Sequence, residues 1–268
     1  MRLGTGGEYL KRYRATNDIF LDEKILTQPL HWKRPRRIFP CSMSDLFGEW
    51  VPDEMIDRVF AVMALCPRHS FQVLTKRAER MRDYMRSREG SDAIDILRGG
   101  DGSWKWPLDN AWYGVSVEDQ RRADERIPVL LDTPAAVRWV SAEPLLGPVD
   151  FDIEHEDEIW HTLSGYVSSD AFGRMGKLHV PINWVVVGGE SGPGARPFKI
   201  EWARSIIAQC KAAGVAVFMK QLGANPQHNG RWTGEAYETR LRDRKGGDPS
   251  EWASDLRVRE YPAQNHDR

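Results

Sequence analysis

The sequence has few cysteines, and they are widely separated. Cys41, Cys66 and Cys210 are the three cysteines in 268 residues, and this odd, dispersed set argues against a disulfide framework. Zinc and iron–sulfur motifs place their cysteines close together, which this chain does not do. We therefore expect a reducing, cytoplasmic environment and no cofactor held by this chain alone.

Long apolar stretches and a large net charge are also missing. No run of about 18 apolar residues suggests a membrane span, and the N-terminus lacks the apolar segment of a signal peptide. The formal net charge is -1, so no overall field favours nucleic acid or a membrane. The basic cluster Lys33–Arg37 leaves local contact with phosphates open, although such runs are more often solvated surface.

Short apolar runs alternate with stretches of helical periodicity. The predicted strands cover residues 37–41, 70–74, 111–117, 136–140, 184–187 and 215–219. The predicted helices include residues 52–65, 77–86 and 201–213, and a further helix that reaches Leu131. This rhythm predicts βαβ units and a parallel sheet that is buried on both faces. We expect an α/β fold with about six βα units, forming a parallel (β/α) partial barrel; a doubly wound open sheet is the alternative.

The predicted barrel-like domain covers residues 1–223 and contains two interruptions. Residues 87–107 are rich in Gly, Ser and Asp and are expected to form a long loop. Residues 151–181 mix acidic residues with Gly and Ser and are expected to be an insertion between two strands. Residues 224–268 form a polar C-terminal extension that packs on the barrel or trails from it.

Polar residues follow every predicted strand. In parallel α/β folds, binding sites form beyond the carboxyl ends of the strands. The candidates for catalysis are Asp45, Lys76, Glu118, Glu143, Glu190 and Lys220. The candidates for ligand binding are Ser44, Arg77, Ser116, Gly189, Ser191, Gly192, Gly194, Arg196 and Gln221.

Several of these residues have a structural explanation as well as a functional one. Asp45 can cap a turn, or it can serve as a carboxylate ligand or base. One of Lys76 and Arg77 can neutralise a nearby acid while the other binds a carboxylate or phosphate group. Glu143 can form a buried pair with Lys220, or it can be a catalytic carboxylate with a raised pKa.

The segment Gly188–Pro197 is unusually rich in glycine. Its glycines allow the backbone to approach a ligand, its N–H groups can cradle an anion, and Arg196 can add further donors. It matches neither the Walker loop nor the G-x-G-x-x-G dinucleotide motif, and a tight turn before a helix is the alternative.

The chain also has no metal-binding histidine spacing and no G-x-S-x-G nucleophile motif.

Segments along nearly the whole chain resemble the phage gene-product-thirty-seven/sixty-eight family, a domain of unknown function. They are Pro29–Phe39, Ser42–Phe47, Phe71–Arg77, Gly114–Gln120, Val140–Gly147, Val186–Pro197, Phe218–Gln221, Asp243–Asp248 and Leu256–Pro262. Full-length members usually begin with a three-cysteine motif similar to the cluster-binding loop of radical S-adenosylmethionine (SAM) enzymes. The resemblance therefore implies a radical-SAM/TIM-like barrel, and an iron–sulfur cluster and S-adenosylmethionine in full-length relatives. This chain lacks the cysteine triad, so the resemblance implies a fragment, a misassigned start or a member that lost its cluster.

Three functions remain open at this point. The leading hypothesis is a phage or prophage-encoded, radical-SAM-like barrel protein without its cluster-binding segment. The second is a non-catalytic module that uses Arg36, Arg37 and Arg196 to hold a nucleotide, nucleic acid or partner protein, nucleic acid being the least favoured. The third is a cluster-free, metal-dependent hydrolase or transferase that uses Asp45 and Glu143.

Overall fold

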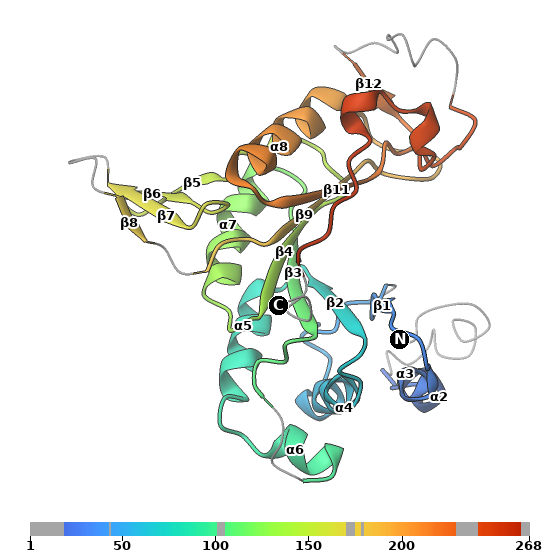
Figure 1. Ribbon diagram of the computed structural model, residues 1–268, viewed down its shortest axis with the longest axis vertical. Helices are drawn as coiled ribbons and strands as arrows, with labels where there is room; N and C mark the ends of the chain where they lie inside the picture. The colour runs from blue at the N-terminus through green and yellow to red at the C-terminus, as the bar shows by residue number, and fades with distance from the viewer. Residues whose placement is uncertain are drawn as a thin grey trace. The chain divides into compact units, whose positions relative to one another are not determined.

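The computed structural model describes residues 19–42, 44–100, 105–169, 175–177, 180–228 and 241–263 (Figure 1). It divides into two compact units, one of residues 1–115 with 132–137 and one of residues 116–131 with 138–268. In the part of the chain that is described, no helix combines the length and the apolar character needed to cross a membrane. The predicted boundary at residues 223 and 224 differs from this division; residues 1–18, 229–240 and 264–268 lie outside the described residues.

The first unit contains three parallel strands in the order β1-β2-β3. They are β1 (Arg37–Ile38), β2 (Ser70–Thr75) and β3 (Ala111–Ser116), and β3 is buried along its whole length. The predicted first strand extended to Cys41 but ends at Ile38. Pro40 lacks the N–H group that a ladder needs, and Cys41 has a left-handed φ of 58°.

Five helices lie in the described part of this unit. They are α2 (Glu23–Leu26), α3 (Gln28–His31), α4 (Asp53–Ala64), α5 (Ala78–Ser87) and α6 (Ala93–Arg98). The acidic residues Asp53 and Glu54 occupy the first turn of α4, where they suit the helix dipole. Helix α6 corrects the prediction of a loop over residues 87–107. Its buried Ile94 anchors it, and Gly99 ends it with a left-handed φ of 116°.

The second unit contains the parallel strands β4, β9 and β11, in that order. They are β4 (Val137–Ala142), β9 (Trp184–Gly188) and β11 (Ala216–Gln221). Helix α7 (Gln120–Leu131) precedes β4, and α8 (Ile200–Ala213) connects β9 to β11. Every residue of β9 is buried, which fits the apolar run Trp184–Val187.

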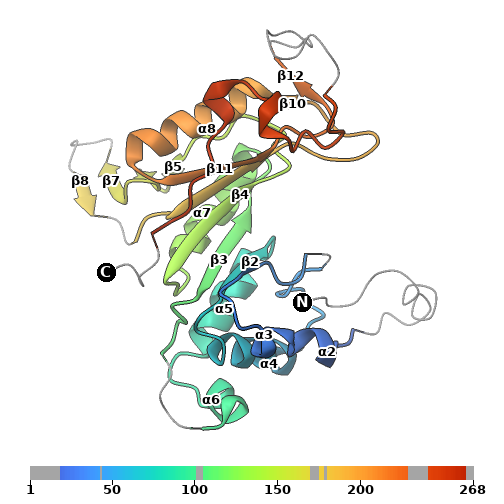
Figure 2. The same ribbon diagram turned by 45° about the vertical axis from the view of Figure 1, so that its right-hand side comes forward.

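The described part of the predicted insertion folds as a four-stranded antiparallel sheet, of which β7 and β8 are yellow in Figure 2. Its strands are β5 (Asp152–His155), β6 (Glu158–His161), β7 (Tyr166–Ser169) and β8 (Met175–Lys177), in sequential order. The amide of Gln209 on α8 holds the entry to this sheet, accepting from Phe151 N–H at 2.9 Å and donating to Val149 O at 2.9 Å.

The C-terminal segment packs on the second unit. Short strands β10 (Phe198–Lys199) and β12 (Pro226–Gln227) pair in parallel, and two 3-10 turns follow, η1 (Pro249–Glu251) and η2 (Ser254–Leu256). Val258 O accepts from Met219 N–H and Glu260 N–H donates to Val217 O, both at 2.9 Å, so this segment lies along β11. Trp252 is fully buried.

The α/β class and the parallel pairing of the predicted strands are confirmed. All six predicted apolar runs contain a strand, three in each unit, and the four predicted helices are present. The boundaries shift by one to three residues, as expected where helix and strand ends fray.

Candidate functional site

The predicted site residues divide between the two units. Four lie in the first unit, namely Ser44, Asp45, Lys76 and Arg77. The others lie in the second unit, namely Ser116, Glu118, Glu143, Gly189, Glu190, Ser191, Gly192, Gly194, Arg196, Lys220 and Gln221.

Asp45 organises the loop after β1 and the end of β2. Its Oδ1 accepts hydrogen bonds from Phe47 N–H at 3.0 Å and from Thr75 Oγ1 at 2.7 Å. Its Oδ2 accepts from Lys76 N–H at 3.1 Å and from Arg77 Nη1 at 3.0 Å. Four donors occupy the acceptor sites of one carboxylate, so the geometry suits a turn-capping role better than that of a base.

Arg77 also contacts an exposed aromatic ring. Its guanidinium carbon lies 4.5 Å from the ring centre of Trp50, whose relative exposure is 56%. Lys76 is exposed, and the buried hydroxyl of Ser44 has no hydrogen-bond partner among the described atoms. The group therefore offers a cation over an aromatic face, an arrangement that also suits stacking of a ligand ring.

In the second unit, Glu143, Lys220 and Gln221 meet at the carboxyl ends of β4 and β11. Lys220 Nζ lies 2.9 Å from Oε1 and 2.8 Å from Oε2 of Glu143. Gln221 Nε2 donates to Glu143 Oε1 at 3.2 Å and to Gly189 O at 2.8 Å. The Glu143 side chain is 16% exposed and that of Lys220 is 52% exposed, so the carboxylate is fixed below a solvent-accessible ammonium group.

Glycine at the end of β9 brings the backbone close to this carboxylate. A Cβ atom on Gly188 would lie 3.1 Å from Cδ of Glu143, which is tighter than an ordinary contact. Gly189 N–H donates to Gln221 O at 3.0 Å. The three strands therefore converge on Glu143, which has β9 backbone on one side and β11 side chains on the other.

The loop after β9 is closed by a bidentate ion pair. Arg196 donates from Nε to Oε2 and from Nη2 to Oε1 of Glu190, both at 2.9 Å, and its N–H adds a third bond at 2.9 Å. These bonds lower the pKa of Glu190 to about 2. Gly192 and Gly194 take left-handed φ values of 104° and 75° within the loop, and Ser191 is exposed.

Ser116 and Glu118 are tied to helix α7. Arg126 Nη1 donates to Ser116 O at 2.7 Å and to Glu118 Oε2 at 3.0 Å, and both residues are buried. Glu118 O accepts from Leu146 N–H at 2.7 Å. This contact fixes the chain after β3 to the chain after β4.

The cysteines do not fit an iron–sulfur cluster. Cys41, Cys66 and Cys210 are all buried. Burial raises the pKa of the Cys66 thiol, and it raises the pKa of the Cys210 thiol to about 12. A cluster ligand must be a thiolate, which these surroundings disfavour. No group of three or more metal-ligating side chains occurs among the residues with described positions. We therefore derive no step through a cluster.

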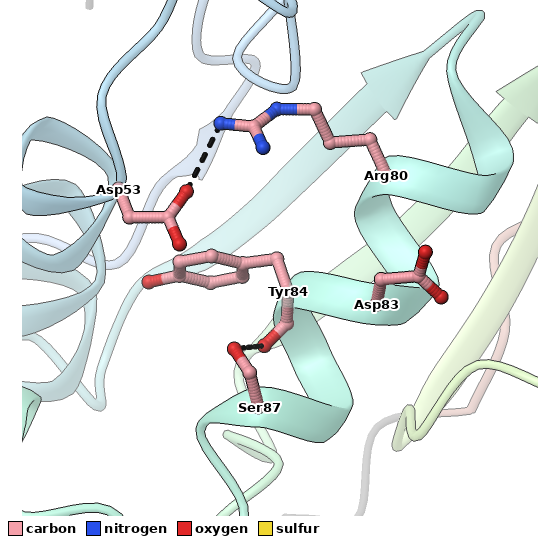
Figure 3. Close-up of a pocket in the computed structure, with 5 residues that line it drawn as sticks. All are labelled: Asp53, Arg80, Asp83, Tyr84 and Ser87. Atoms are coloured by element: carbon pink, nitrogen blue, oxygen red, sulfur yellow. Dashed lines mark hydrogen bonds and ion pairs between the residues drawn. The ribbon is translucent and has the colours of Figure 1, made fainter.

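A cavity of about 440 Å³ in the first unit lies on helices α4 and α5 (Figure 3). Its lining comprises Asp53, Arg80, Asp83, Tyr84 and Ser87, and it includes none of the strand-end candidates. Arg80 pairs with Asp53 at 3.0 Å across the opening. Burial and Asp57 raise the pKa of Tyr84, which keeps its hydroxyl protonated as a donor. The bonds of Arg80 to Asp53 and of Tyr84 to Asp57 tie α5 to α4, so we assign the cavity a structural role. The buried Nε of Arg80 has no hydrogen-bond partner among the described atoms.

Sequence reasoning missed one polar set, on the small antiparallel sheet. Asp152, His161 and Ser168 lie within hydrogen-bonding distance on adjacent strands β5, β6 and β7. The local strand signal is the alternation of acidic and apolar residues over Asp150–Glu154. The acidic and Gly-rich composition of the segment favours an irregular insertion, which is why strands are not predicted there.

Comparison with protein-family models matches residues 2–252 to a family described as "Protein of unknown function (DUF5131)". No curated protein and no solved structure matched the chain. The matched region includes every strand-end candidate.

Proposed function

Since the chain belongs to the DUF5131 family of unknown function, we propose from its geometry that the second unit binds a small zwitterionic ligand. The ligand carries an ammonium group and a carboxylate, as the amino-acid part of S-adenosylmethionine does. Its site comprises Glu143, Lys220 and Gln221. The loop Glu190–Arg196 follows directly after Gly189, whose carbonyl oxygen accepts a hydrogen bond from Gln221. The observation that carries the proposal is the pairing of a fixed Glu143 with an accessible Lys220.

An ion pair of this kind can exchange partners with a zwitterion. The ligand's ammonium group replaces Lys220 on Glu143, and Lys220 turns outward to the ligand's carboxylate. No charge is left unpaired in either state, which avoids the large cost of an isolated charge at a partly buried position. Gln221 is held by Gly189 O, so it keeps the Glu143 carboxylate oriented while the exchange takes place.

We further propose that the fold is a radical-SAM/TIM-like partial barrel of phage gene-product type. The six parallel strands and the sequence resemblance support this identity. S-adenosylmethionine is therefore the first ligand to test, as a bound ligand and not as a source of radicals. The buried cysteines give no support to cluster chemistry in this chain.

Calorimetric titration tests the proposal directly. S-adenosylmethionine and S-adenosylhomocysteine should bind, and 5′-methylthioadenosine, which lacks the amino-acid group, should bind at least tenfold more weakly. Glu143→Gln and Lys220→Met should each weaken binding about 10- to 100-fold, since a charged hydrogen bond contributes about 1.5–3 kcal/mol. The control Lys211→Met, on the exposed surface of α8, should bind as wild type. Equal binding by Glu143→Gln and wild type would refute the proposed site.

A nucleotide- or nucleic-acid-binding module is the second candidate, favoured by two cation–aromatic pairs in the first unit. The guanidinium carbon of Arg36 lies 4.4 Å from the ring centre of Trp32, and Arg77 covers Trp50 at 4.5 Å. Aromatic faces beside arginines suit base stacking and phosphate contacts. Binding to single-stranded oligonucleotides that weakens steeply with salt, and is lost in Trp50→Ala, would support this function.

A further inference from the structure

The small antiparallel sheet of the second unit carries a hydroxyl, an imidazole and a carboxylate in one line. His161 Nδ1 lies 2.9 Å from Asp152 Oδ1, and His161 Nε2 lies 3.0 Å from Ser168 Oγ. We propose that these three side chains form a nucleophilic triad that cleaves carboxylic esters. Ser168 is the nucleophile, His161 the base and Asp152 the residue that positions the base.

Strand register explains why these residues meet. Asp152 lies directly opposite His161 in the β5–β6 ladder, so both side chains are on the same face of the sheet. In the β6–β7 ladder His161 lies opposite Tyr166, and Ser168 follows Tyr166 by two residues on that same face. The three functional groups are therefore held by backbone pairing and not by a mobile loop.

The hydrogen bonds determine the tautomer that the chemistry requires. His161 Nδ1–H donates to the Asp152 carboxylate. In the neutral imidazole Nε2 then carries no proton, so it can accept a hydrogen bond from the Ser168 hydroxyl. The His161 side chain is 27% exposed, so a substrate can reach it. The exposed ring of Tyr166 lies on the same face and offers an apolar surface for an aryl or acyl group.

The reaction balances with water as the only co-reactant. Ser168 Oγ forms a bond to the ester carbonyl carbon while its proton moves to His161 Nε2. The carbon–oxygen bond to the alcohol breaks, and the alcohol leaves with that proton. Water then transfers a proton to His161 Nε2 and attacks the acyl carbon. The bond from that carbon to Ser168 Oγ breaks, the acid leaves, and His161 returns its proton to Ser168 Oγ. We expect slow turnover, because Asp152 is 56% exposed and water weakens its support of the imidazolium.

A fluorophosphonate probe followed by peptide mapping tests the triad on the intact chain. The probe's phosphorus should bond to Ser168 Oγ as fluoride leaves, and 4-nitrophenyl acetate should give a burst of one nitrophenolate per chain. His161→Gln should slow labelling about 100-fold or more, and Asp152→Asn about tenfold. The control Ser164→Ala removes a nearby hydroxyl that donates only to the His161 carbonyl, at 3.3 Å, and should label normally.

Wild-type mapping alone can overturn the proposal, so the test does not depend on a variant folding. Labelling at a different serine, or none at Ser168, contradicts it. Unchanged labelling in His161→Gln, with a native circular dichroism spectrum, also contradicts it and leaves the three residues as a cross-strand hydrogen-bond ladder. Failure here does not affect the zwitterion site, which uses no residue of this sheet.

Discussion

Gly189 and Leu222 lie so close together that position 189 has no room for a side chain. A Cβ atom on Gly189 would be 2.2 Å from the carbonyl oxygen of Leu222 and 2.7 Å from its carbonyl carbon. Gly223, the residue after Leu222, is equally close to the residue after Gly189: a Cβ atom on Gly223 would lie 2.6 Å from Glu190 O. The segments after β9 and β11 therefore pack backbone against backbone. This packing explains glycine at 189 without requiring a ligand.

Replacing this glycine should destabilise the second unit. We expect Gly189→Ala to lower the free energy of unfolding by about 3 kcal/mol, because the obstructing atoms are backbone and cannot rotate away. Urea denaturation followed by tryptophan fluorescence measures the change. Gly147→Ala is the matched control, since its Cβ would lie at ordinary contact distances from Asp119, 3.5 Å from Cβ and 3.9 Å from Cα. A Gly189→Ala protein as stable as this control would contradict the close packing.

The fold was more predictable from the sequence than the site. Apolar runs such as Trp184–Val187 and the periodicity of residues 52–65 are local signals, so they located the strands and helices. The small sheet was missed because its alternation covers only residues 150–154 and the rest of the segment is acidic and Gly-rich. At the site, the sequence allows the pairing of Glu143 with Lys220 as one of two interpretations. The partners Arg126 and Trp50 could not be derived, because a local pattern does not specify which distant side chain it meets.

A buried charge network in the first unit should be sensitive to the loss of its acid. Asp57 is buried and accepts from Tyr84 Oη at 2.7 Å and from Arg88 Nε at 2.7 Å. Asp57→Ala leaves Arg88 without its main partner at a 14% exposed position, and should cost about 3–5 kcal/mol of stability in urea unfolding.

Two further variants separate the charge effect from packing. Replacing both partners, as in Asp57→Leu with Arg88→Met, should recover most of the stability lost by the single change. Glu125→Ala removes an exposed partner of Arg121 and should change stability by less than about 1 kcal/mol. If the double variant were as unstable as Asp57→Ala alone, the unpaired charge would not be the cause.

The Glu190–Arg196 pair should give the loop after β9 a pH-dependent stability. Hydrogen bonds from Arg196 lower the pKa of Glu190 from its ordinary 4.5 to about 2. The folded state therefore binds this proton less readily than the unfolded state. The stabilisation is complete above the ordinary pKa and is lost as the pH falls through the folded value.

Comparison with Glu190→Gln isolates this effect. Wild type should be the more stable protein above about pH 5, and the difference should vanish as the pH falls below about 2. Added salt should reduce the difference above about pH 5, because Arg196 is solvent-exposed and Glu190 is partly exposed. Carbon-13 NMR of the Glu190 carboxyl group gives an independent reading. A midpoint at the ordinary glutamate value would show that the loop does not hold this pair in solution.

The cysteines should be inert in the folded protein. Cys210 is fully buried on α8, and burial, followed by the charge of Glu260, raises its pKa to about 12. Burial also raises the pKa of Cys66. Since the thiolate is the reactive form, native protein at pH 8 should react with much less than one equivalent of a disulfide reagent within minutes. In denaturant, all three thiols should react.

One variant distinguishes the two causes at Cys210. Glu260→Gln removes the negative charge but leaves the helix packed, so the thiol should remain slow to react if burial dominates. A large increase in rate would mean either that the charge is the main cause or that the segment along β11 has come loose. The thermal unfolding midpoint separates these cases, since Glu260 Oε2 also accepts from Val217 N–H at 3.2 Å. Rapid modification of Cys210 in the wild-type protein would contradict the buried position of its thiol and, with it, the packing of α8.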